Sequence, residues 1–273
     1  MTSGPRSFAK RHPLVTYFAL AYFFTWSVFV TLALVKHGVI RLDVPSFIYY
    51  FGSHGPLLSA ITTTALIGGS EGLKDLFERM FRWRVRPLWW LVALSPFLLY
   101  VVTAIILYFI QGEWTHIGLL GEVEFMPSLG IGALFLWLLT FGIGEETGWR
   151  GFALPRLQRN RSALRATLIL WVFWALWHTP AFFLVYDPAI VFGFLPGLLA
   201  GAIVFTWLYN SSGGSILIVA VWHGVFNFTT ASKASKAGLV AAVISTLVMV
   251  WAVVVVLWFK PANLSHREKQ TIE

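Results

Sequence analysis

Apolar runs of about 20 residues recur along the whole chain, separated by short polar segments. A run of this length lets a helix cross the hydrocarbon core of a bilayer. The runs lie near 14–35, 46–67, 88–110, 129–149, 163–184, 190–209, 214–231 and 238–259. The first run is too long for a signal peptide, whose apolar core is about 7–15 residues. We therefore predict an all-α fold, a polytopic transmembrane helical bundle with about eight transmembrane helices.

A longer polar interruption, 69–87, mixes apolar residues such as Leu76 with basic residues such as Arg79. This pattern predicts an amphipathic helix on the membrane surface, with a plain basic loop as the alternative. Lys and Arg also gather in both termini and in the loop 156–165. Because short cytoplasmic loops carry the excess of Lys and Arg, we predict that both termini and the amphipathic segment are cytoplasmic.

Composition supports a multi-pass membrane protein. Of the 273 residues, 58% are hydrophobic and 12% are charged, whereas a soluble domain has about 25% charged residues. We expect one integral membrane domain, 1–273, whose partner is the lipid bilayer. The net charge of +8 is explained by topology, so we expect no nucleic acid partner. With no cysteine, the chain has neither a disulfide, a thiolate metal ligand nor a cysteine nucleophile.

Three polar signatures lie inside the apolar runs. They are Glu-Glu-Thr-Gly-Trp-Arg at 145–150, Trp-Ala-Leu-Trp-His at 174–178 and His-Gly-Val-Phe-Asn at 223–227. A charged side chain at bilayer depth costs on the order of 2.5–3.5 kcal/mol by insertion scales, so it needs a partner or a task. Because carboxylate, imidazole and guanidinium groups occur together, we interpret them as one catalytic site inside the membrane.

The first signature combines two carboxylates with an arginine. Residues four apart share one face of a helix, so we predict that Glu146 and Arg150 form an ion pair. Adjacent residues point about 100° apart, so Glu145 faces another direction with a less compensated charge. Glu145 is therefore the better candidate for a general base that takes a proton from water.

The other two signatures supply histidines. His178 ends a helical stretch, and Pro180 should kink or end that helix and leave room beside the imidazole. A histidine in an apolar helix is also commonly a hydrogen-bonded structural group. His223 and Asn227 are four apart, a spacing suited to holding an oxyanion or a metal-bound water. For this pair the alternative is ordinary interhelical hydrogen bonding.

Other intramembrane protease motifs are absent from the sequence. The chain contains no HExxH of a site-2 type zinc protease and no GxGD of an aspartyl type. The segment 213–216, Gly-Gly-Ser-Ile, differs from the Gly-x-Ser-Gly of a rhomboid, and we interpret Ser215 as part of a turn. There is also no glycine-rich phosphate loop. The carboxylates and histidines therefore carry the candidate chemistry.

The three signatures resemble those of the CAAX prenyl endoprotease and bacteriocin-processing (CPBP, abortive-infection) family of intramembrane glutamate proteases. The EExxxR motif is met by Glu145, Glu146 and Arg150, and HxxxN by His223 and Asn227. The FxxxH motif occurs with tryptophan at position 174 in place of phenylalanine. The resemblance covers about 70–230, which we take as the catalytic core.

The resemblance implies a glutamate-dependent endopeptidase in which Glu145 and His178 activate water. His223 and Asn227 would form the oxyanion site, supported by Glu146 and Arg150. Family members are often labelled metalloproteases. We favour metal-independent chemistry without a cofactor, and the alternative is a zinc ion held by Glu145, His178 and His223.

The motifs specify a reaction and leave the substrate open. A prenylated protein with a C-terminal CAAX sequence, a leader peptide and the membrane anchor of another protein are all membrane-associated peptide substrates that fit. Two other classes compete with the protease. One is a proton- or ion-coupled membrane transporter using the same carboxylates and histidines, and the other is a non-catalytic membrane scaffold or immunity protein.

Overall fold

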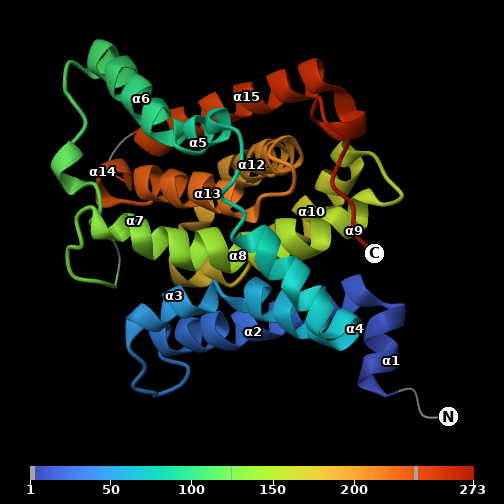
Figure 1. Cartoon of the computed structure of the whole chain (residues 1–273). Coiled ribbons are helices and arrows are strands. Elements are labelled where there is room, and N and C mark those ends of the chain that lie inside the picture. Colours follow the sequence, from blue (N-terminus) through green and yellow to red (C-terminus); the bar gives the residue numbers. More distant parts are fainter. Residues whose placement is uncertain (1–3, 124, 237–238) are drawn as a thin grey trace.

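The structure is a computed structural model that describes residues 4–123, 125–236 and 239–273. Every regular element within these ranges is a helix, which confirms the predicted all-α class. In Figure 1, α2 and α4 lie side by side on one side of the molecule, and α6 and α15 lie on the opposite side. Helices α8, α10 and α13 lie between them. The three polar signatures are therefore on the central helices.

The long helices follow the apolar runs. Their bounds are Pro13–Lys36 (α2), Gly55–Met80 (α4), Ser95–Gln111 (α6), Ala163–Trp177 (α10), Val191–Ser211 (α12), Ile216–Thr230 (α13) and Val240–Asn263 (α15). Shorter helices are Pro5–Arg11 (α1), Tyr49–Gly52 (α3), Pro87–Ala93 (α5), Gly132–Trp137 (α7), Gly144–Gly148 (α8), Leu154–Gln158 (α9), Ala181–Leu184 (α11) and Lys233–Lys236 (α14). The predicted start of the last run, residue 238, lies outside the described residues.

Four described helices are long and apolar enough to cross a membrane, and the bent pair α5 and α6 makes five if counted as one span. The predicted count of about eight is not confirmed by this criterion. The predicted spans 46–67, 129–149 and 214–231 are not among these helices, and for the last two the reason is visible. Helix α13 has 15 residues, fewer than the ~20 that span a bilayer. The stretch 132–158 is divided by two π-helical segments.

The segment 69–87 differs from the expected separate surface helix. Its first part continues α4, which bends at Gly69, where φ is 60° and ψ is −146°. The helix ends at Met80, and Leu76, Arg79 and Met80 are buried against the protein. A basic loop is therefore the wrong description for this part of the segment. The half of α4 after Gly69 packs on the bundle because its apolar face and Arg79 find protein partners.

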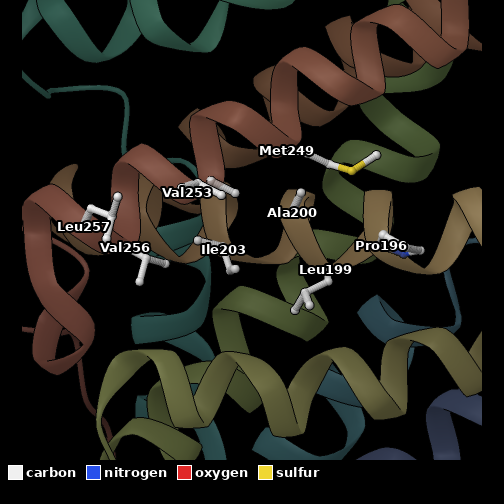
Figure 2. A pocket seen from close by; sticks show the side chains of 9 residues that line it. Pro196, Leu199, Ala200, Ile203, Met249, Val253, Val256 and Leu257 are labelled. Atoms are coloured by element: carbon white, nitrogen blue, oxygen red, sulfur yellow. The ribbon is translucent and has the colours of Figure 1, made fainter.

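An apolar groove of about 300 Å³ lies along the contact between α12 and α15. Figure 2 shows Pro196, Leu199 and Ile203 of α12 facing Met249 and Val253 of α15 across this space. None of the residues of the three polar signatures lines the groove. The polar chemistry of the chain therefore lies elsewhere, on the inner faces of α8, α10 and α13.

Candidate active site

Helix α8 carries both glutamates and is bounded by π-helical segments, η3 (Leu138–Ile143) and η4 (Trp149–Ala153). Single π turns inside α-helices are frequent at functional sites. Glycines let this stretch approach its neighbours closely. A Cβ atom at Gly148 would lie 2.6 Å from the carbonyl oxygen of Pro56 and would also overlap the Tyr17 hydroxyl. The close packing places the first signature in the interior of the protein.

The predicted ion pair between Glu146 and Arg150 is present, and it has a third member. Arg150 Nη1 lies 3.1 Å from Glu146 Oε1 and Oε2, and both side chains are fully buried. His223 Nδ1 lies 2.8 Å from Glu146 Oε1. The Arg150 guanidinium lies 4.5 Å from the ring centroid of Trp174 and 4.6 Å from that of Phe205. Glu146 thus connects the arginine of the first signature to the histidine of the third.

Glu145 faces different partners, as predicted. Its Oε2 accepts hydrogen bonds from the indole nitrogens of Trp174, at 2.8 Å, and Trp149, at 3.3 Å. Only 1% of the residue is exposed. Within the described residues, no group donates a hydrogen bond to Oε1. One carboxylate oxygen of Glu145 is therefore held by the protein, while the other has no protein donor.

His178 follows the last residue of α10, so the helix ends before Pro180 as predicted. Its Nδ1 lies 2.7 Å from the carbonyl oxygen of Trp174. A carbonyl oxygen only accepts hydrogen bonds, so Nδ1 is the donor. In the neutral ring, Nε2 then carries the lone pair. The bond to Trp174 therefore leaves His178 Nε2 as the nitrogen that can accept a proton.

Asn227 lies one helical turn after His223 on α13. Helix α13 begins at a cap in which the Ser215 side chain accepts a hydrogen bond from the amide of Ile218. The interpretation of Ser215 as a turn residue is thus confirmed. Asn227 is half-buried, and among the described residues its side chain has no hydrogen-bond partner. Within the part of the chain that the structure describes, no hydrogen bond joins the Asn227 side chain to either glutamate.

The remaining signature residues converge around Trp174. Its ring centroid lies 5.5 Å from that of His178 and 6.1 Å from that of His223. The same indole bonds Glu145 and covers Arg150. Side chains from α8, η4, the C-terminal end of α10 and α13 therefore form one buried carboxylate–histidine cluster: Glu145, Glu146, Arg150, His178 and His223.

The alternative zinc site does not match this arrangement. Within the described residues, no group of three or more histidine, aspartate or glutamate side chains could hold a metal ion. The residues as placed do not fit a three-ligand zinc ion, and we derive no step through a metal.

Several neighbours of the cluster were not identified from the sequence as site residues. Trp149 lies in the first signature but was not assigned as a donor, and Phe205 lies in an apolar run without a polar signal. Tyr17, from α2, packs on Trp149 with ring centroids 5.7 Å apart, and its buried hydroxyl has no partner within the described residues. Only the aromatic character of these residues could have indicated them.

The apolar helices and the buried cluster define an integral membrane protein with a carboxylate–histidine site. Residues 127–229, which include all three signatures, match the family described as Type II CAAX prenyl endopeptidase Rce1-like. The chain is also similar to the CAAX prenyl protease 2 of Methanococcus maripaludis, with 25% identity over 225 residues, 77% of this chain and 81% of the relative. The resemblance to the CAAX protease family is therefore confirmed, and it supports a membrane protease.

Proposed function

We propose that this protein is an intramembrane endopeptidase that hydrolyses a peptide bond of a membrane-associated substrate. The observation that carries the proposal is the convergence of Glu145, Glu146, Arg150, His178 and His223 around one indole. These residues come from α8, η4, the end of α10 and α13, all within the segment that matches the family. A buried group of ionisable side chains at this depth needs a task, and peptide hydrolysis uses all of its members.

In the proposed first step, Glu145 and His178 activate a water molecule. Glu145 Oε1 has no donor among the described residues, and His178 Nε2 carries the lone pair, so both atoms can accept a hydrogen bond from water. The water oxygen forms a bond to the scissile carbonyl carbon while its proton passes to Glu145. The carbonyl π electrons move to the oxygen, which becomes an oxyanion.

His223 and Asn227 stabilise that oxyanion. Glu146 holds His223 through Nδ1, so Nε2 is the ring nitrogen left for the substrate. Nδ1 donates to the Glu146 carboxylate, so Nε2 can donate only when the ring is an imidazolium, a cation that this carboxylate stabilises. In that form Nε2–H and the amide group of Asn227 donate hydrogen bonds to the developing charge. In the second step the oxyanion re-forms the carbonyl, the C–N bond breaks and the proton held by Glu145 passes to the leaving amine. The new carboxylic acid releases its remaining proton to solvent. The products are a new carboxylate and a new amine, and no cofactor takes part.

We propose a prenylated protein with a C-terminal CAAX sequence as the substrate, because the relative is named a CAAX prenyl protease. A leader peptide or another membrane peptide is the alternative. The substrate would enter from the cytoplasmic side or laterally between helices. This orientation, with both termini cytoplasmic, follows from the basic tails and loops.

The test compares wild type with Glu145→Ala, purified in detergent, on a farnesylated CAAX peptide and a peptide pool from a membrane proteome. We expect Glu145→Ala to lose about two to four decades in rate while keeping its melting temperature. Glu113→Ala, at an exposed carboxylate, is the matched control and should remain active. Each reaction is run with and without a chelator, which tests metal dependence.

Two outcomes would overturn the proposal. Cleavage by Glu145→Ala at the wild-type rate would remove the proposed base from the mechanism. Absence of cleavage by folded wild-type protein on every peptide, together with an ion flux that Glu145→Ala abolishes, would favour a transporter instead.

A further inference from the structure

Trp174 makes more contacts to the polar cluster than an aromatic packing residue requires. Its indole nitrogen donates to Glu145 Oε2 at 2.8 Å, and its carbonyl oxygen accepts from His178 Nδ1 at 2.7 Å. Its ring also covers the Arg150 guanidinium at 4.5 Å. A phenylalanine at this position would retain the carbonyl and a ring, but it has no N–H. The indole N–H is thus the hydrogen-bond donor that distinguishes tryptophan from phenylalanine at position 174.

We infer that the Trp174 indole N–H is a positioning group for the proposed hydrolysis, and this inference rests on the proposed function. By bonding Oε2, the N–H orients the Glu145 carboxylate so that Oε1 faces the water. The backbone carbonyl of the same residue orients His178. One residue of α10 therefore sets the directions of both groups that activate water.

The chemistry of the donor makes this assignment specific. An indole nitrogen only donates hydrogen bonds, and an ionised carboxylate only accepts them. Hydrogen bonds to a charged acceptor are stronger than neutral ones. Of the two indoles that bond Oε2, Trp174 at 2.8 Å is closer than Trp149 at 3.3 Å. With both indoles on Oε2, rotation of this buried carboxylate would break two hydrogen bonds.

The test measures kcat and KM for wild type, Trp174→Phe and Trp171→Phe on the peptide that wild type cleaves. Trp171 is the matched control because it lies one turn earlier on α10 and donates to the carbonyl of Leu195 at 3.2 Å. We expect Trp174→Phe to lower kcat by about 10- to 100-fold, the range for a hydrogen bond to a charged group. KM should change by less than about threefold, because an interaction that acts only in the chemical step leaves ground-state binding unchanged. Trp171→Phe should keep wild-type kcat.

A second variant separates the N–H from the size of the ring. Placing 3-benzothienylalanine at position 174 keeps the bicyclic shape and replaces only the N–H, so its kcat should fall as far as that of Trp174→Phe. This isostere also provides the test if Trp174→Phe does not fold. Wild-type kcat in the isostere would overturn the inference, as would an equal loss in Trp171→Phe.

Failure of the inference differs from failure of the proposed function. If wild type cleaves, Glu145→Ala does not, and the isostere at position 174 is fully active, only the positioning role is wrong. If wild type cleaves no peptide, or Glu145→Ala cleaves normally, the proposed function itself is wrong.

Discussion

Two acid–arginine pairs with the same four-residue spacing occur on the helices of this protein, and their surroundings differ. On α4, Arg79 donates to Asp75 Oδ2 from Nε at 2.9 Å and from Nη2 at 2.8 Å. Its Nη1 reaches the carbonyl of Gly151 at 2.6 Å and the hydroxyl of Tyr209 at 3.2 Å. Every nitrogen of Arg79 therefore has a partner, and the side chain ties α4 to η4 and α12.

The pair at the candidate site is held in another way. Arg150 donates from Nη1 to Glu146, whereas its Nε and Nη2 have no hydrogen-bond partner within the described residues. Instead of hydrogen-bond acceptors, the aromatic rings of Trp174 and Phe205 contact the Arg150 guanidinium. Glu146 is fully buried and also bonds His223, whereas the Asp75 side chain is 52% exposed.

The comparison teaches that the spacing alone does not assign a task to an acid–arginine pair. Water solvates the half-exposed Asp75, so the pair on α4 acts as a structural tie that is screened by solvent. Glu146 has only protein partners, so its charge depends on Arg150 and on the histidine that it orients. The Glu146–Arg150 pair differs from the Asp75–Arg79 pair in the burial of its acid and in the histidine that this acid also bonds.

The largest effect is expected at the buried pair. Glu146→Gln leaves the Arg150 charge without a counter-ion, and breaking a buried pair costs about 3–5 kcal/mol of unfolding free energy. We also expect kcat to fall because His223 loses its carboxylate partner. Thermal and denaturant unfolding in detergent measure the first effect, and the peptide assay measures the second. Unchanged stability would mean that the rings alone compensate the Arg150 charge.

An intermediate effect is expected where α8 meets its neighbours. Gly148→Ala would push a methyl group against Tyr17 and Pro56, and overpacking of this kind costs about 1–3 kcal/mol. Gly201→Ala is the matched control, because no atom lies within 4 Å of an added Cβ there, so the melting temperature should be maintained. Equal melting temperatures for both variants would show that α8 can move away from α2 and α4.

The smallest effect is expected at the pair on α4, whose acid is half-exposed. Asp75→Asn removes a half-exposed partner of Arg79, and such a pair contributes about 0–1 kcal/mol. The peptidase rate should not change, and the small stability difference should shrink as salt is added. If Asp75→Asn lowers the free energy of unfolding as much as Glu146→Gln does, the two pairs do not differ in the way proposed here.

Much of the helical organisation could be predicted because hydropathy is a local property of the chain. The runs 14–35 and 163–184 correspond closely to α2 and to α10 with α11. The number of spans and the behaviour of 69–87 could not be predicted in the same way. The number of spans and the packing of 69–87 depend on which faces of α4 and α13 pack against other helices. The hydropathy of consecutive residues does not show these contacts.

At the candidate site too, contacts within one helix could be predicted from the sequence, whereas contacts between helices could not. Helical spacing predicted the bond between Glu146 and Arg150, and it predicted that Glu145 would face elsewhere. The bonds from Glu146 to His223 and from Glu145 to Trp174 join residues 77 and 29 positions apart. Helical periodicity extends over one element only, so it could not supply these pairings.

The sequence by itself determined the helical class, the membrane character and the ionisable residues of the site, because apolar length and the cost of buried charge are read from consecutive residues. Tertiary structure alone decided that Trp174 lies among Glu145, Arg150 and both histidines. It also decided that Arg79 is a buried tie and not a membrane-surface cation. The physical reason is that a side chain acquires its partners only when separate helices pack and exclude water between them.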